Sequence, residues 1–131
     1  MSKYAKHTRV PIERSQAEIQ KILKKYGASK FGLLDQGENA CIAFEAQNRR
    51  IRFILPLEPG HDQTNRSRWR CLVLVIKAKL ECIDTGLETF EEAFMPHIIL
   101  PNGRTISEWV TPQLEKTYEH GKMPPLLGYD G

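Results

Sequence analysis

Apolar and polar residues recur with the period of a helix between positions 15 and 26, and this pattern changes near residue 27. Four apolar residues between positions 15 and 26 share one side of this predicted helix: Ile19, Ile22, Leu23 and Tyr26. Lysines fall on the opposite side. The stretch from Ser15 to Glu18 has the sequence of a capping box, and Gly27 is a typical helix stop. The pattern predicts an N-terminal helix over residues 15–26.

Three segments with a period of two follow this helix: KFGLLD at 30–35, ACIAFEA at 40–46 and RRIRFIL at 49–55. They are separated by tight polar turns, which predicts an antiparallel three-stranded meander with one buried face. The other face would carry Arg50 and Arg52 beside Glu45. Cross-strand ion pairing is the alternative to ligand binding for these arginines.

The stretch RWRCLVLVIKAKLECI, residues 68–83, is apolar on two sides when drawn as a helix. One side carries Trp69, Leu72, Val73, Ile76, Leu80 and Ile83. The other side carries Cys71, Leu74, Val75, Ala78 and Cys82. The cations lie along the two edges between these sides, where their apolar stems can cover the surface while the charged ends reach water. A strand over the run LVLVI is the alternative, although the long stripe and Gly86 favour a helix.

A helix with two apolar sides belongs between two layers or against a second copy, so the sequence predicts a homodimer. The alternative is that the C-terminal third covers the second side with Trp109, Val110, Leu114 and Tyr118. Capping boxes at Thr89–Glu92 and Thr105–Glu108 predict short helices there. A brief strand is expected over residues 97–100, and Thr111-Pro112 has the pattern of the start of a further helix.

These elements predict an α+β fold with an N-terminal helix, a three-stranded antiparallel β-meander, a long central helix and short C-terminal helices. Residues 1–14 are expected to form a basic extended arm, residues 15–121 one domain, and residues 122–131 an extended tail with two prolines. The length of 131 residues suits a single domain.

Composition narrows the class of protein. Cys41, Cys71 and Cys82 are an odd number of cysteines without a C-x-x-C pair, which is typical of a reducing cytoplasm. No apolar run approaches the roughly 20 residues of a membrane span, and the N-terminus has no apolar core of a secretory signal. We therefore expect a cytoplasmic protein without a membrane partner.

The net charge of +3 is distributed unevenly along the chain. Residues 1–30 hold eight Lys and Arg against two Asp and Glu, and residues 66–80 hold five against none. Residues 81–131 reverse this balance, with three against nine. Such polarity indicates an acidic partner, nucleic acid included. The alternative is that the two signs face each other inside the fold.

Motifs of catalysis and metal binding are absent from the sequence. The four histidines are widely separated, and none has a cysteine or a second histidine at the spacing of a zinc site. There is no G-x-S-x-G elbow and no glycine-rich phosphate loop. We therefore predict no catalytic residue, no metal ligand and no cofactor.

Basic residues remain as the candidate nucleic-acid-binding site, provided that the fold brings them together along a groove. They are Lys21, Lys24, Lys25, Arg49, Arg50, Arg52, Arg66, Arg68 and Arg70. Tyr4, Tyr26 and Phe31 are candidates for stacking on bases, with burial in the core as the alternative.

Several stretches of the sequence resemble a group of small phage- and prophage-encoded proteins without an assigned activity. They are YGASKFG, RRIRFILPL and the long stretch from RWRCLVLVIK to GKMPPLL, which together span most of the chain. The resemblance carries no catalytic residues with it. It implies a bacterial host cytoplasm, a phage genome, and a role in DNA metabolism or in countering host defence.

The sequence thus predicts a small non-enzymatic phage-type protein that contacts nucleic acid through a basic surface. The alternative is an anti-defence protein that inhibits a host system by binding a host protein, with the acidic C-terminal third as its contact surface. A small enzyme is the third hypothesis.

Overall fold

The structure of the protein, a computed structural model, describes residues 3–123, with side chains from residue 5 onward. Its elements in chain order are α1 (Lys3–Lys6), α2 (Ile12–Tyr26), β1 (Ser29–Asp35), β2 (Asn39–Ala46), β3 (Arg49–Pro56), α3 (Asp62–Asp84), α4 (Phe90–Phe94), the 3-10 helix η1 (Met95–His97) and α5 (Ile106–His120). The predicted α+β fold and its order of elements are confirmed.

The three strands form one antiparallel sheet in the order β1-β2-β3. Alternate residues of β2, from Ala40 to Ala46, are buried, as the period of two predicts. Gln47 and Asn48 join β2 to β3 with φ angles of 53° and 61°. Both angles lie in the left-handed region that a two-residue hairpin requires.

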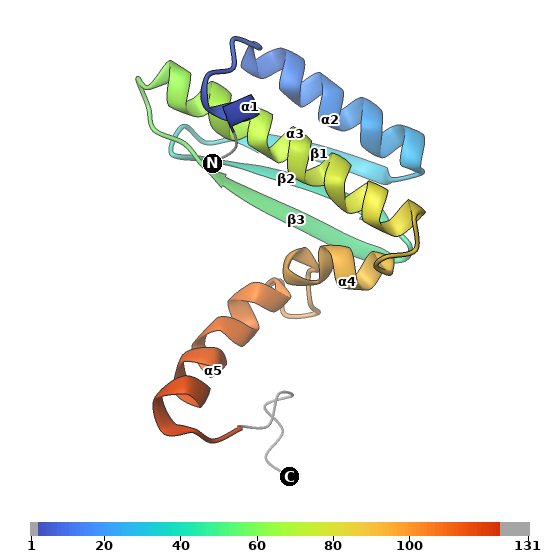
Figure 1. Cartoon of the computed structure of the whole chain (residues 1–131), viewed down its shortest axis with the longest axis vertical. Helices are drawn as coiled ribbons and strands as arrows, with labels where there is room; N and C mark the ends of the chain where they lie inside the picture. Colours follow the sequence, from blue (N-terminus) through green and yellow to red (C-terminus); the bar gives the residue numbers. More distant parts are fainter. Residues whose placement is uncertain (1–2, 124–131) are drawn as a thin grey trace.

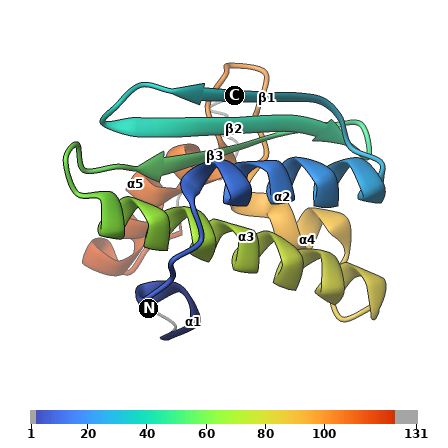
Figure 2. The ribbon, with the colours of Figure 1, turned by 90° about the horizontal axis from the view of Figure 1, so that it is seen from above.

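Helices α2 and α3 lie side by side on one face of the sheet, so the body has two layers (Figures 1 and 2). The apolar stripe of α3 packs into the core between them. Trp69, Val73 and Ile76 have no exposed surface, and Leu72 has 6%. The central helix and its principal buried side are confirmed, and the alternative of a strand over residues 72–76 is wrong.

The second apolar side of α3 is only partly covered. Val75 and Ala78 are exposed, whereas Cys71, Leu74 and Cys82 are half-buried. The alternative that Trp109, Val110, Leu114 and Tyr118 would cover this side is wrong, because the helix that carries them, α5, leaves the body at η1 and extends away from α3 (Figure 1).

The expected extended arm is wrong for the described part of residues 1–14. Residues 3–6 form α1, and α2 already begins at Ile12. Gln63 donates a hydrogen bond of 2.9 Å to the carbonyl of Thr8, and the Ser67 hydroxyl donates one of 3.0 Å to the carbonyl of Lys6. These side chains from the start of α3 hold the N-terminal segment against the body. Residues 122 and 123 follow α5, and the rest of the predicted tail lies outside the described residues.

Two of the three predicted capping boxes are present, at Thr89–Glu92 and Thr105–Glu108. The one expected at Ser15 is wrong, because Ser15 is fully buried in the second turn of α2 and Pro11 is the residue before the helix. Glu18, its expected partner, instead reaches across to α3. Tertiary ion pairs of Glu18 have thus replaced the capping hydrogen bonds that were expected within the helix.

Helix α5 continues through Pro112, so the predicted new helix at Thr111 is wrong. Proline at this position removes the hydrogen bond to the carbonyl of Glu108. The Arg104 side chain supplies a replacement, because its guanidinium donates a hydrogen bond of 3.1 Å to that carbonyl. The freed backbone acceptor is therefore satisfied, and the helix tolerates the proline.

The C-terminal third is joined to the edge of β3. Ile98 forms a β-bridge with Ile51, so the brief strand expected over residues 97–100 is present as a short pairing with β3. Phe94 is fully buried and packs edge-on against Phe44 and Phe53, with ring centroids 5.9 and 6.2 Å apart. Burial of this phenylalanine anchors α4 and η1 on the core.

We expect the substitution Trp69→Ala to lower the free energy of unfolding by about 3–5 kcal/mol, since it leaves a large cavity in the core. Denaturant titration would measure the loss. The control Val75→Ala, on the exposed side of the same helix, should cost under about 1 kcal/mol. Equal losses for both variants would contradict the placement of Trp69.

Candidate nucleic-acid interface

Helices α2 and α3 each present a row of cations along the groove between them. Residues four and seven apart lie on one side of a helix, which places Arg14, Lys21 and Lys25 together on α2. The same spacing places Arg66, Arg70 and Lys77 together on α3. These six residues are called the α2–α3 basic face below.

One carboxylate joins the two rows. Glu18 of α2 accepts a hydrogen bond of 2.7 Å from the Arg70 guanidinium and lies 2.6 Å from the Lys77 ammonium. The hydrogen bond from Arg70, followed by that from Lys77, lowers the pKa of Glu18 below its usual value. Glu18 therefore stays ionised at neutral pH and neutralises part of the surrounding positive charge.

The groove consists of two adjoining hollows with volumes of about 560 and 790 Å³. They share Ile22, Lys25 and Lys77, so they are continuous along the helices. Glu81 and Asp84 line the far end. The groove thus changes from basic to acidic along the direction of α3, and an anion is favoured only in its first half.

The helical layer carries six of the nine predicted cations, and four of them belong to the α2–α3 basic face: Lys21, Lys25, Arg66 and Arg70. Lys24 and Arg68 are the exceptions. Lys24 lies on the other side of α2, in a hollow shared with Lys30 of β1.

The arginines of β3 do not join this surface. Arg50 and Arg52 alternate with the buried Ile51 and Phe53, so they lie on the sheet face opposite the helices. Arg50 lies directly opposite Glu45 across the two strands, as predicted. The alternative of an ion pair between them is wrong for the described residues, because Glu45 pairs with Lys30 at 3.3 Å.

Several of the predicted cations instead connect parts of the fold. Arg49 pairs with Glu91 of α4 at 3.0 Å, and Arg52 pairs with Glu108 of α5 at the same distance. Arg68 pairs with the Glu58 carboxylate at 3.3 Å and also donates to the carbonyl of Pro56. These ion pairs attach the C-terminal third and the β3–α3 loop to the body.

Two members of the α2–α3 basic face were not among the predicted site residues. Arg14 belongs to the predicted arm, although its spacing of four, seven and eleven residues to Glu18, Lys21 and Lys25 is helical. Lys77 lies in the predicted central helix, but the predicted site does not include it. The helical spacing was the signal that could have found both.

Of the aromatic candidates with described side chains, Tyr26 lines the groove, but its ring packs against the core. Tyr26 is half-buried and stacks on Phe90 with centroids 6.3 Å apart, and Phe31 is half-buried beside the core. The side chain of Tyr4 lies outside the described residues. For Tyr26 and Phe31 the alternative of burial holds.

Neither metal-ligating nor membrane-spanning features occur within residues 3–123. No three His, Cys, Asp or Glu side chains of this part of the chain gather as metal ligands would. None of its helices has both the length and the apolar character needed to cross a membrane. Cys41, Cys71 and Cys82 are free thiols, each half-buried.

His97 is the most strongly perturbed histidine of the described residues. Its ring stacks on Phe53 at 4.0 Å between η1 and β3. Burial, and then the nearby charge of Lys79, lower its pKa from 6.5 to about 4, while a hydrogen bond with the backbone of Arg52 acts in the opposite direction. His97 is therefore neutral at physiological pH and serves in packing.

Comparison with known proteins finds no match: no family model, no curated protein and no solved structure is significantly similar to this chain. The resemblance to phage-encoded proteins stays a hypothesis.

We expect the free energy of unfolding to decrease as the pH falls from about 6.5 towards 4, because the unfolded chain then binds a proton at residue 97 that the folded chain refuses. The contribution of His97 to stability is complete above about pH 7, where this side chain is neutral in both the folded and the unfolded chain. Equilibrium unfolding at a series of pH values would measure it.

His97→Phe is the matched variant, since it retains the stacking on Phe53 without a titrating group. Its stability should vary less over the same range of pH. The lowered pKa of Glu18 and of Glu108 affects stability only below their normal value of 4.5, so these carboxylates do not produce the same effect. An unchanged pH profile would contradict the assignment to His97.

Proposed function

We propose that this protein is a non-enzymatic nucleic-acid-binding protein that contacts the sugar–phosphate backbone through the α2–α3 basic face. The observation that carries the proposal is the alignment of six cations in two rows on adjacent helices, with Glu18 between the rows bound to Arg70 and Lys77. The predicted charge asymmetry of the chain is thereby concentrated on one surface.

The chemistry of this surface suits phosphates better than bases. Lysine and arginine at successive helical turns are spaced along a line, as phosphate contacts are, and they carry no fixed pattern of donors and acceptors for base edges. The floor of the groove is formed by apolar side chains, including Ile22 and Leu80. Binding is therefore expected to depend strongly on salt and weakly on sequence.

The Glu18 carboxylate occupies a position beside two cations where a phosphate group could also be bound. Its carboxylate accepts from Arg70 and lies beside Lys77, and both cations would make equivalent contacts to phosphate oxygens. Lys21 and Lys25 are exposed, and no carboxylate of the described residues forms an ion pair with them. They provide the free charge that attracts the nucleic acid, while Glu18 limits the affinity.

We expect the double substitution Lys21→Glu and Lys25→Glu to weaken binding to DNA and RNA oligonucleotides and to make the dependence of log affinity on log salt less steep by about 2. Fluorescence anisotropy at several salt concentrations would measure both quantities. The two side chains are exposed, so the fold should be retained.

The matched control is Lys24→Glu with Arg50→Glu, which changes the net charge equally at exposed positions outside the groove. It should bind nearly as the unmodified protein does. Equal weakening by both double variants would place the interface elsewhere, and an unmodified protein that binds neither DNA nor RNA would refute the function.

We expect the substitution Glu18→Gln to strengthen binding and to steepen the salt dependence, since it frees Arg70 and Lys77 for phosphates. Loss of the ion pairs should lower the free energy of unfolding by only about 1 kcal/mol, because the partners are partly exposed. The control Glu13→Gln removes an exposed carboxylate from the first turn of the same helix. A Glu18→Gln variant that folds but binds more weakly would contradict the proposed role of Glu18.

A further inference from the structure

The two rows of cations on α2 and α3 face a common hollow. Glu18 lies between the rows, 2.7 Å from the Arg70 guanidinium and 2.6 Å from the Lys77 ammonium. Lys77 of α3 lines the same hollow as Lys21 and Lys25 of α2. An anionic group in this hollow can therefore be contacted from either side. A single sugar–phosphate backbone is the polyanion that matches cations arranged in this way.

A duplex fits this surface less well. Helices that pack together have axes about 8–10 Å apart and are each about 10–12 Å wide, so α2 and α3 side by side are about 20 Å across. The major groove of B-DNA is about 12 Å wide and admits one helix. A duplex would therefore rest on the outer rims of the α2–α3 groove, and its two backbones could not both lie between the rows of cations.

The two helices run parallel, which gives the groove two different ends. Glu18 of α2 meets Arg70 of α3. Farther along, Tyr26 shares a hollow with Ile83, so residue numbers rise together on both helices (Figures 1 and 2). The last carbonyls of both helices carry partial negative charge, and they lie at the end of the groove that is already acidic. A phosphate is disfavoured at this end.

The hollow at the acidic end suits an uncharged base. Its lining includes the half-buried side chains of Ile22, Leu80 and Ile83, and its volume of about 790 Å³ is large enough for a nucleobase. The faces of bases are accessible in a single strand, whereas stacking and pairing enclose them in a duplex. A base of a single strand can thus lie against these apolar side chains while the neighbouring phosphates stay between the cations.

We propose that the α2–α3 groove binds single-stranded nucleic acid in preference to duplex. The sugar–phosphate backbone lies between the two rows of cations, and an unstacked base lies in the second hollow against Ile22 and Leu80. This preference presupposes the proposed function, since it concerns the same groove, and it adds the class of nucleic acid that the groove selects. Single strands of DNA and RNA share the chemistry on which it depends.

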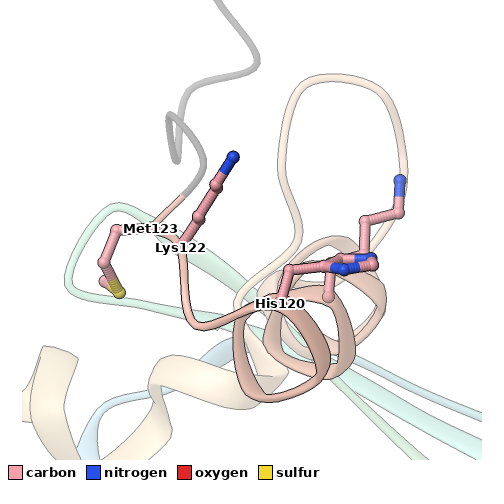
Figure 3. Close-up of a pocket in the computed structure, with 4 residues that line it drawn as sticks. His120, Lys122 and Met123 are labelled. Atoms are coloured by element: carbon pink, nitrogen blue, oxygen red, sulfur yellow. The ribbon is translucent and has the colours of Figure 1, made fainter.

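A second group of cations provides a contrast. Lys116, His120 and Lys122 line a hollow at the end of α5, together with Met123 (Figure 3). In the part of the chain that the structure describes, these side chains come from the last turns of α5 and the residues directly after it, and no second row of cations faces them. This hollow therefore offers no line along which one backbone is held from both sides, and it serves as a control.

Fluorescence anisotropy with one labelled oligonucleotide, alone and annealed to its complement, tests the preference. About 12 nucleotides suffice, because residues 14–25 and 66–77 each cover about 16 Å of helix, the length of about five stacked nucleotides. We expect the single strand to bind about ten-fold more tightly than the duplex, as one base contact implies. A strand of the same length with abasic sugars in place of its nucleosides should bind about ten-fold more weakly than the unmodified strand.

Variants of the protein locate the base contact. Leu80→Gln should lower the affinity for the single strand about three-fold more than the affinity for the duplex, since only an accessible base reaches the second hollow. Val75→Gln makes a similar change on the exposed side of the same helix and should leave the preference intact, as should Lys116→Glu with Lys122→Glu. Circular dichroism would confirm that each variant is folded. The abasic strand tests the same contact on the unmodified protein, so the test does not depend on the folding of Leu80→Gln.

The outcomes distinguish the preference from the proposed function. A duplex that binds as tightly as the single strand, with both weakened by Lys21→Glu and Lys25→Glu, would overturn the preference and leave the proposed function standing. Equal binding of the abasic and the unmodified strand would also overturn it, as would a preference that the α5 double variant abolishes and Leu80→Gln does not. A protein that binds neither single strand nor duplex would refute the proposed function and the preference together.

Discussion

Burial of one stripe of α3 against the inner face of the sheet is the contact on which the other features of this molecule depend. Trp69, Val73 and Ile76 are completely enclosed, and together they determine the rotation of α3 about its axis. A helix turns by about 100° per residue, so a shift of one residue would bury cations and expose the stripe. Because the stripe is buried, Arg70 and Lys77 lie at the edge that faces α2.

The same rotation sets the contacts of α3 with its neighbours. Glu18 of α2 meets Arg70 and Lys77 on one edge, while Lys79 on the other edge donates a hydrogen bond of 2.6 Å to the carbonyl of Ala93 in α4. The cations in this apolar run are therefore neither scattered through the core nor equivalent. Some secure the packing of adjacent helices, and others remain at the surface with their charge available.

Opposite charges in this chain are partly paired and partly separated. Arg49 and Arg52 of β3 hold Glu91 and Glu108, so the acidic third is attached to the body by the basic middle, as the alternative interpretation of the charge asymmetry expected. Six other cations lie on the α2–α3 basic face. The exposed Leu114 and Tyr118 lie on α5, which extends towards the other end of the long axis (Figure 1).

Local patterns in the sequence determined the strands, their turn, the main helices and the capping boxes at Thr89 and Thr105, because these features depend on residues close together in the chain. Tertiary contacts decided the rest. Glu18 leaves its expected cap for two cations of α3, and Arg104 satisfies the carbonyl that Pro112 leaves free. Gln63 and Ser67 hold a segment that looks like a free arm. The nine predicted cations could be identified from composition, but their division between two faces depends on strand parity and helix rotation in the assembled fold, which no local pattern specifies.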